Sequence, residues 1–324
     1  MFSFLLVTQC RDEGFSMQPL THPTRMIALL AGLVTSGLLL SGCAAPSDDS
    51  AVAVDAASVI DTLKADATLA AAVPADLRDA GVVHVASGVS FPPMEFFDVD
   101  GTTVVGFDAD LGAALGQVLD VDFKFENVNF DGIVGGIAAG RYDLSLTGIL
   151  DTPSRQAEVD FVDYLQSGVS ILVASGNAVD INGPEDLCGH SASVEKGATG
   201  DLTIDSLQAA CADAGKAAIE KLPFPDQASA VQAVSSGRAD ASVALDVTLA
   251  YTVQTSNDAF ELAGDPFNTL PVGIVVPKDN PELRDAVQGA LLNVIESGVY
   301  DQILAKWGLE KQALTGAPIN SGVE

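Results

Sequence analysis

The sequence predicts an α/β protein made of two similar lobes. Short apolar runs that suit buried strands alternate with helical patterns along most of the chain. The tetrapeptide Gly-Arg-x-Asp occurs twice, at 140–143 and at 237–240, each time between a predicted helix and a predicted strand. In each case an Asp (Asp131 or Asp226) is expected to cap the helix, and the Gly to end it. A repeat with the same flanking elements indicates two related α/β units.

The remaining elements follow the same alternation. In the first unit we expect a helical segment over 56–80 broken at Pro74, strands over 82–86, 103–107, 121–125 and 144–146, and helices over 108–119 (capped by Asp108) and from 129 to 140. In the second unit we expect a helix over 227–235 and a strand over 241–244. Two long apolar strands, 168–174 and 270–276, would cross between the units, and helices over 281–297 and 299–307 would return to the first.

The N-terminal region carries an export signal. Residues 26–40 form an uncharged run that is too short to span a membrane comfortably but suits the apolar part of a signal peptide. The run ends in Leu-Ser-Gly-Cys43, which resembles the bacterial lipoprotein box and implies cleavage before Cys43 and its lipidation. We therefore expect a signal peptide over 1–42, a lipidated Cys43 and a flexible tether to residue 55. An ordinary signal peptide with a chance cysteine is the alternative. Residues 1–16 include Arg11, Asp12 and Glu13 and do not suit the basic start of a signal peptide. We therefore expect the true start at Met17 or Met26.

Composition excludes several classes of function. The 324 residues suffice for two domains, and the net charge of −29 argues against nucleic-acid binding, which needs basic patches. The chain has only three histidines and neither an HExxH nor a CxxC motif. This scarcity argues against hydrolase or metal chemistry. We expect no metal site, no catalytic residues and no cofactor.

Arg155 stands out in the stretch from 144 to 161. It falls in the first turn of a helix that is expected to begin near Pro153, with Asp151 or Thr152 as its cap. The helix dipole disfavours a cation there, so Arg155 needs another reason to be present. A guanidinium next to free backbone N–H groups is a good receiver for a carboxylate. The alternative is an ordinary exposed arginine.

Two cysteines of the second unit, Cys188 and Cys211, are expected to pair, because exported proteins form disulfides. A loop of this length is worth about 3.5 kcal/mol in the chain-entropy model. Two free buried thiols are the alternative.

Several motifs together resemble the amino-acid-type substrate-binding proteins of bacterial ABC importers, solute-binding protein family 3. The resemblance covers about 74–309, and its most specific parts are Phe-Pro-Pro-Met-Glu at 91–95, Gly-Phe-Asp-Ala-Asp-Leu at 106–111, Phe-Asp-Gly at 130–132, Asp-Thr-Pro-Ser-Arg at 151–155, Val-Asp-Phe at 159–161 and Lys-Gly-Ala-Thr at 196–199. It implies a type II periplasmic-binding-protein clamp, with two mixed-sheet lobes joined by two hinge strands. The expected bounds are 56–167 plus 269–315 for lobe 1, 168–268 for lobe 2 and 316–324 for a C-terminal tail.

The resemblance also implies ligand-binding roles. Phe91 would stack on one face of the solute and Phe130 would line the opposite wall. Thr147 and the Gly148 backbone would hydrogen-bond the solute, and Arg155 would hold its α-carboxylate. N–H groups and a hydroxyl for the same carboxylate would come from Gly197, Ala198 and Thr199. These residues stand at a predicted helix start, which favours anions.

The sequence departs from the family pattern at three positions. Leu150 and Ala198 stand where hydroxyl residues are usual. Leu245 aligns with the acidic residue that normally binds the α-ammonium, and Asp246 follows it. A shift of one residue on a strand would turn Asp246 to the other face, unless a bulge restores it. The carboxylate half of the site is thus expected intact, and the ammonium half is left open.

The resemblance implies a monomeric extracytoplasmic receptor, lipid-anchored to the cell membrane, that carries an amino acid or an amino-acid-like carboxylate to an ABC permease. One alternative is an exported enzyme of the cyclohexadienyl-dehydratase type, for which Glu195 is the nearest candidate general acid. The other alternative is a solute sensor that signals through a membrane partner.

Overall fold

The structure is a computed structural model that describes residues 56–323. The predicted signal peptide, Cys43 and the tether lie outside the described residues. From residue 56 to residue 323, no helix has the length and apolar character needed to cross a membrane.

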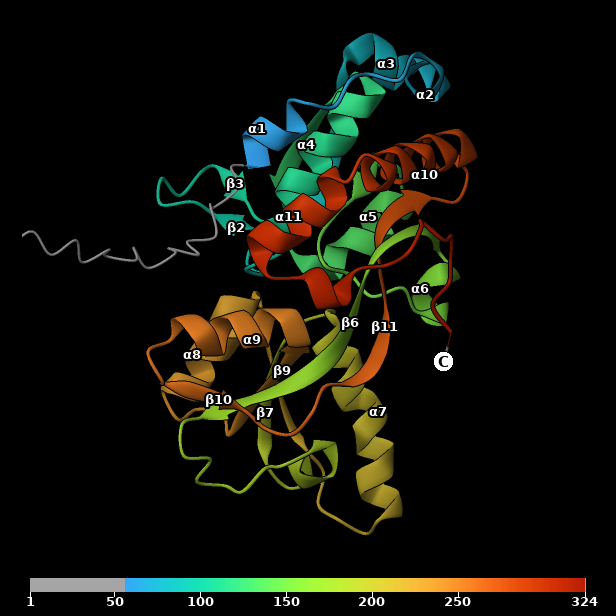
Figure 1. Ribbon diagram of the computed structural model, residues 1–324. Coiled ribbons are helices and arrows are strands. Elements are labelled where there is room, and N and C mark those ends of the chain that lie inside the picture. Colours follow the sequence, from blue (N-terminus) through green and yellow to red (C-terminus); the bar gives the residue numbers. More distant parts are fainter. Residues whose placement is uncertain (1–55, 324) are drawn as a thin grey trace, which may run out of the picture. The chain divides into compact units, whose positions relative to one another are not determined.

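One nine-stranded sheet organises the described body (Figure 1). Two groups of parallel strands flank a central antiparallel pair, β6 and β11. The strand order is β4 (Asp122–Asn127), β1 (Val82–Ser87), β5 (Leu144–Ser145), β11 (Phe267–Pro277), β6 (Val159–Ala174), β9 (Ala241–Leu245), β7 (Ser191–Glu195) and β8 (Glu220–Phe224), and β10 (Phe260–Leu262) also pairs with β6. We call the part around β4, β1 and β5 the first lobe, and the part around β9, β7 and β8 the second lobe.

The two long strands are the hinge of a two-lobed clamp, as the sequence predicts. β6 pairs with β11 at its start and with β9 and β10 at its end, so it belongs to both lobes (Figure 1). Both strands are longer than expected. The apolar run of β6 is interrupted in the sequence by Asp160 and Asp163, but both carboxylates find partners: Arg284 Nη1 donates to Asp160 at 3.0 Å, and Ser321 N–H donates to Asp163 at 3.1 Å.

Helices cover the sheet in both lobes. The first lobe holds α1 (Ala56–Ile60), α2 (Ala67–Ala72), α3 (Ala75–Ala80), α4 (Phe107–Leu119), α5 (Ile133–Ala138), α6 (Pro153–Gln156), α10 (Pro281–Glu296) and α11 (Val299–Trp307). The second holds α7 (Thr199–Asp213), α8 (Gln227–Ser235) and α9 (Asp246–Thr255). α10 and α11 pack on α4, so the C-terminal helices return to the first lobe as predicted.

The repeated Gly-Arg-x-Asp motif has the same role in both lobes. Asp143 accepts a hydrogen bond from the His84 N–H of β1 at 2.7 Å, and Asp240 accepts one from the Ser191 N–H of β7 at 2.8 Å. Each Asp therefore ties the start of its strand to the neighbouring parallel strand. This shared contact supports the structural similarity of the two lobes.

Helix starts differ from the prediction at two places. Asp226 caps α8, accepting from Ser229 N–H at 2.7 Å, but α5 has no such cap because a 3₁₀ turn, Phe130–Gly132, precedes it. The expected Asp131 cap is therefore wrong. Asp108 is also not a cap, because α4 begins one residue earlier and the Asp108 carboxyl turns into the interior.

Two shorter elements also differ from the prediction. The helical segment over 56–80 forms three separate helices, because connecting turns interrupt it twice. The strand expected over 103–107 is only β3 (Val104–Val105), which pairs with β2 (Phe96–Phe97) in a hairpin apart from the main sheet.

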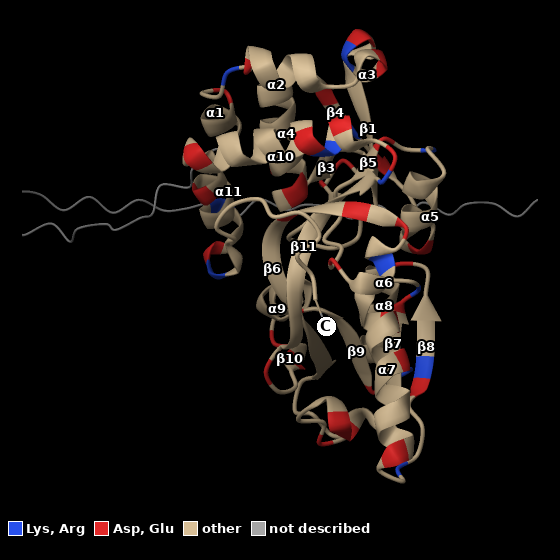
Figure 2. Cartoon of the chain, turned by 90° about the vertical axis from the view of Figure 1, so that its right-hand side faces the viewer, with Lys and Arg blue, Asp and Glu red and all other residues tan. Residues whose placement is uncertain are grey.

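The predicted disulfide between Cys188 and Cys211 is present in the second lobe. It links the segment after a 3₁₀ turn (Pro184–Leu187) to the C-terminal part of α7. Acidic residues occur along both lobes, with fewer basic residues among them (Figure 2). Some of the basic residues form local ion pairs, such as Lys306 with Asp110 at 2.7 Å.

Candidate functional site

Arg155 lies in the short helix α6, where the first lobe meets the second. The Thr152 hydroxyl accepts a hydrogen bond from the Arg155 N–H at 3.4 Å, so Thr152 and not Asp151 is the cap. The Asp151 carboxylate is buried and accepts from the Gly322 N–H at 2.8 Å. The loop that carries Arg155 is thus held from both sides.

The Arg155 guanidinium is buried, with only 6 % of the residue exposed. Its nitrogens donate to the carbonyl of Leu150 at 2.9 Å, to the Thr199 hydroxyl at 3.3 Å and to the carbonyl of Gly197 at 3.2 Å. A guanidinium has five N–H donors, so two remain. Within residues 56–323, no carboxylate lies within ion-pair distance of this group.

The electrostatic state of Arg155 follows from this burial. Loss of water around the guanidinium lowers the pKa of Arg155 to about 10, and the charge of Asp151 opposes that shift. The side chain is therefore cationic at neutral pH. A buried cation without a counter-ion is costly, so the position favours binding of an anion.

The start of α7 faces Arg155 from the second lobe. Of the three residues predicted there, Thr199 contacts Arg155 through its hydroxyl, and Ala198 is the N-cap without a side-chain bond. The Gly197 N–H donates to Asp201 Oδ2 at 2.8 Å. A carboxylate in the first turn of α7 thus accepts from this amide in the structure, and the hydrogen bond of the amide to a solute stays a prediction.

Phe91 and Phe130 are both buried, but they do not face each other across an open gap. Their ring centroids are 5.8 Å apart with a tilt of 43°, which is direct packing. The predicted stacking of a solute between the two rings stays a prediction. Phe130 also lies beneath Arg155, with the guanidinium carbon 5.8 Å from the ring centroid. The rings form one apolar wall beside the cation.

The Thr147 hydroxyl and the Gly148 N–H, both predicted to bind the solute, form hydrogen bonds within the protein. The Thr147 hydroxyl accepts from Gly88 N–H and donates to Glu95 Oε1, both at 2.8 Å. The Gly148 N–H donates to Asp108 Oδ2 at 2.9 Å. Buried carboxyls hold both groups in this structure, and their hydrogen bonds to the solute stay a prediction.

Leu150 makes one wall of the site aliphatic. Its carbonyl accepts from Arg155, and its backbone forms a bridge to Val272 of the hinge strand β11. Together with Thr199 and Leu202 it lines a cavity of about 450 Å³. Leu150 itself brings no hydroxyl to this cavity, in contrast to the residue that the family pattern leads one to expect at this position.

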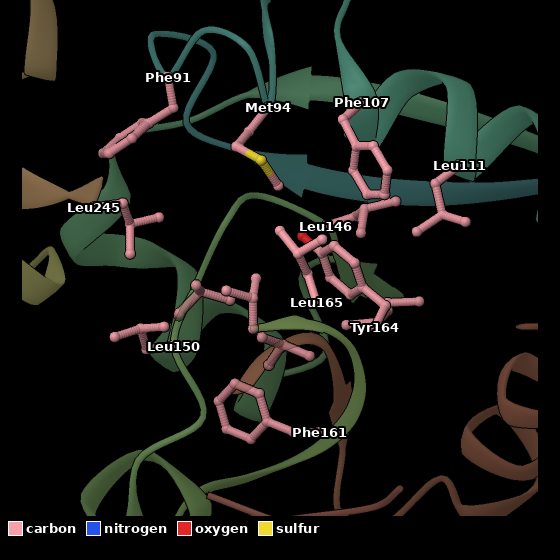
Figure 3. Packing of buried hydrophobic residues seen from close by; sticks show 14 of the residues in the cluster. Phe91, Met94, Phe107, Leu111, Leu146, Leu150, Phe161, Tyr164, Leu165 and Leu245 are labelled. Carbon is pink, nitrogen blue, oxygen red and sulfur yellow. The ribbon is translucent and has the colours of Figure 1, made fainter. Parts of the chain in front are cut away.

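Leu245, and not Asp246, faces the first lobe. A methyl group built on Gly148 would lie 3.3 Å from Leu245 Cδ1, and Met94 belongs to the same buried cluster (Figure 3). Asp246 begins α9, where its carboxylate accepts from Ser167 Oγ and from the Val247 N–H. The Asp246 carboxylate therefore serves the hinge and the helix start in this structure, and its contact with the solute stays a prediction.

Glu195 is the site residue that the sequence identified only as a candidate acid. It ends β7, is 2 % exposed, and its Oε2 has no hydrogen-bond partner in the described part of the chain. Burial raises the pKa of Glu195 to about 9, with further contributions from the charges of Asp226 and Asp131. In the sequence, only its position directly before Lys-Gly-Ala-Thr indicated that Glu195 belongs to the site.

The site therefore combines two groups of residues. Around the guanidinium the structure brings together Phe130, Leu150, Arg155, Gly197 and Thr199. A first-lobe network holds Thr147 and Gly148 through Glu95 and Asp108, neither of which sequence reasoning had placed in the site. Only the Phe-Pro-Pro-Met-Glu motif hinted at Glu95.

Comparisons with known proteins agree with this geometry. The chain belongs to the bacterial extracellular solute-binding proteins, family 3, whose family model matches residues 83–310. It is 30 % identical over 301 residues to the arginine-binding protein ArgT of Corynebacterium glutamicum, covering 92 % of this chain and 96 % of that protein. The chain is thus a solute-binding receptor of this family.

Solved structures give the same picture. An ancestral arginine-binding protein bound to arginine is 34 % identical, with a TM-score of 0.64, over 70 % of this chain and 98 % of that one. The ancestral amino-acid-binding protein AncCDT-1, a precursor of cyclohexadienyl dehydratase, is 30 % identical with a TM-score of 0.64, over 72 % and 97 %. These likenesses agree with the two-lobed clamp.

Proposed function

We propose that the chain is the lipid-anchored receptor of an ABC importer for an amino acid or an amino-acid-like carboxylate. The observation that carries the proposal is the Arg155 guanidinium, which is buried between the lobes and lacks a carboxylate partner among the described residues. A carboxylate is planar and accepts two parallel N–H bonds, which matches the two donors that remain on Arg155. This function requires the site to bind the solute and not to catalyse a reaction.

The contacts between the lobes support a closing mechanism. Arg155 bonds to Gly197 and Thr199 across the junction, and Lys196 Nζ lies 2.7 Å from Asp131 Oδ2. A solute held by both lobes would favour the closed form by its extra affinity for it. The closed form would then dock on the permease.

The location follows from the sequence and the family. Family members are extracellular proteins by description, and the lipoprotein box at Cys43 would anchor this chain to the membrane. Residues 44–54 would act as a tether of about 18 Å in the random-coil regime. We propose that the protein acts as a monomer, with lobe 1 formed by 56–167 and 269–315, lobe 2 by 168–268 and a tail by 316–324.

The relatives narrow the solute class. Several matched proteins are named for arginine and others for cystine or histidine, and several matched structures hold arginine. An amino acid is therefore the first choice for a solute screen. Ligands that bind only the folded clamp raise its apparent stability, so thermal shifts against amino acids, their derivatives and plain carboxylates would identify it.

The test of the proposal is calorimetry of Arg155→Ala with the solute found in that screen. We expect a loss of affinity of about 100-fold or more, because one partner of a buried charged contact is removed. Arg141→Ala is the matched control, since Arg141 is an exposed arginine of the same lobe, and its affinity should be unchanged. Unchanged affinity in Arg155→Ala would overturn the proposal.

A second candidate function is favoured by one observation. Glu195 is a buried acid whose raised pKa keeps it protonated at neutral pH, as a general acid requires. An enzyme of the cyclohexadienyl-dehydratase type would release an aromatic product from prephenate or arogenate. Ultraviolet absorbance after incubation with either compound decides between the two functions, and we expect no product.

A further inference from the structure

Besides the Arg155 guanidinium, an acidic side chain is buried at the junction of the lobes, and one of its oxygens has no hydrogen-bond partner among the described residues. Glu195 Oε2 has no hydrogen-bond partner from residue 56 to residue 323, although only 2 % of the residue is exposed. Buried polar atoms without a partner are rare and need an explanation. An acid that is buried for packing alone would be replaced by an apolar residue at lower cost.

The space beside Glu195 is a cavity of about 310 Å³ between the lobes. The first lobe contributes two loops and the second lobe contributes Glu195 and the start of α8; the lining residues that carry side-chain oxygens are Ser90, Asn127, Asn129, Glu195 and Asp226. None of the residues that line it is a lysine or an arginine. The wall of the cavity therefore offers hydrogen-bond acceptors and the negative charge of Asp226, and no positive charge.

Nearby acids strengthen this character. The carboxylates of Asp226 and Asp131 both act on Glu195, and burial together with these charges raises its pKa to about 9. Asp226 is held in place by Ser229 N–H at 2.7 Å, and Asp131 by Lys196 at 2.7 Å. A bound cation would be stabilised by all three carboxyls, and its arrival would release the proton from Glu195.

The cavity lies within reach of Arg155. The guanidinium bonds to the carbonyl of Gly197, which is two residues after Glu195, and two residues span at most about 7 Å. The two cavities are nevertheless distinct. Arg155 lines one of about 220 Å³ together with Phe130 and Asp131, whereas Asn129 and Glu195 line the other.

We propose that Glu195, with Asp226 beside it, binds a cationic side chain of the solute, so that the solute is an amino acid with a positively charged guanidinium or ammonium end. This inference rests on the proposed function, because it takes the carboxylate of the solute to lie at Arg155. An α-ammonium is separated from its carboxylate by a single carbon and does not reach a second cavity, whereas a side-chain cation does. Leu245, at the usual acidic position, offers the α-ammonium no charge.

The test uses four probes that separate the two ends of the solute. L-Arginine and L-lysine carry both charges, L-citrulline replaces the guanidinium by a neutral group of similar shape, and agmatine lacks the carboxylate. By calorimetry on the wild-type chain, we expect arginine or lysine to bind at least tenfold more tightly than citrulline. In Glu195→Gln that ratio should fall at least tenfold, while citrulline stays within a few-fold of its wild-type affinity.

Controls make the outcomes separable. Glu220→Gln removes an exposed acid from the same lobe and should leave every affinity unchanged. Glu195→Gln resembles the protonated acid, so its thermal unfolding should stay close to that of the wild type. Equal binding of citrulline and arginine, an unchanged ratio in Glu195→Gln, or no binding of either cationic amino acid would overturn the inference. If agmatine binds as tightly as arginine while Glu195→Gln still acts, the carboxylate role of Arg155 fails and the cation subsite stands.

Discussion

The Cα of Gly197 lies against Asp131 of the opposite lobe: a methyl group built on Gly197 would be 2.8 Å from both Cα and Cβ of Asp131. The backbone of Gly197 also has φ +77°, which side chains disfavour. Glycine at this position therefore allows the lobes to meet at the point where Arg155 bonds to the Gly197 carbonyl.

Gly197→Ala should therefore hinder closure and weaken solute binding by at least tenfold. Gly237→Ala is the matched control, because Gly237 has a similar φ of +70° but nothing within 4 Å of the added methyl group. It should cost about 1 kcal/mol of stability and leave affinity unchanged. Calorimetry and urea unfolding of both variants check this; equal affinities in the two variants would contradict it.

Glu95 and Asp108 predict a pH dependence of stability. Burial raises the pKa of Glu95, with a further rise from the adjacent Asp108, and burial raises the pKa of Asp108 to about 6. Folding therefore binds protons, so the free energy of unfolding should fall as the pH rises from about 4 to 6 and above. Asp163, whose pKa burial also raises to about 6, adds to the same window.

Glu95→Gln should make this pH dependence shallower and should raise stability at pH 8. The amide oxygen of the variant side chain can still accept from the Thr147 hydroxyl. The substitution also removes a charge that would form close to Asp108 and Glu195. Denaturant unfolding between pH 4 and pH 8 measures the effect, with the exposed Glu296→Gln as control. A variant that is less stable at pH 8 and has an unchanged slope would contradict the account.

The C-terminal segment is expected to support the loop that carries Arg155. The Gly322 N–H donates to Asp151, and a methyl group built on Gly322 would lie 2.0 Å from the Asp151 carbonyl oxygen. Gly322→Ala should therefore displace the segment, costing about 1–3 kcal/mol of stability and several-fold in solute affinity. Gly135→Ala in α5, where the added methyl group meets nothing within 4 Å, should be neutral or stabilising. Stability is measured by urea unfolding and affinity by calorimetry. Equal stability and equal affinity in the two variants would contradict a supporting role of the C-terminal segment.

The disulfide should matter for stability and little for binding. Replacing Cys188 and Cys211 by alanine should lower the free energy of unfolding by about 3.5 kcal/mol through the chain entropy of the opened loop. Cys211 lies three turns along α7 from Thr199, so solute affinity should change less than threefold. Urea unfolding and calorimetry of the double variant check both statements, and a large loss of affinity would contradict the second.

The sequence predicted those features that depend on local patterns. The bounds of α8 and α11 follow from capping and periodicity, and the hinge strands follow from apolar runs. The disulfide followed from the expected export of the chain. Arg155 was identified because a cation in a first helical turn needs a separate reason.

The parts that sequence reasoning missed depend on contacts between distant residues. The Gly148 N–H donates to Asp108, 40 residues away, and the Thr147 hydroxyl donates to Glu95, 52 residues away. No local pattern reveals such pairings. The unpartnered oxygen of Glu195 likewise becomes evident only when the loops of the opposite lobe are in place.

The central claim is that Arg155 binds a carboxylate, and a paired comparison tests it most directly. The amino acid that binds best and its carboxamide differ only at the group assigned to Arg155. By calorimetry, the wild type should prefer the free carboxylate by about 100-fold, and Arg155→Met should reduce this preference to less than threefold. A preference for the carboxylate that is the same in Arg155→Met as in the wild type would contradict the account.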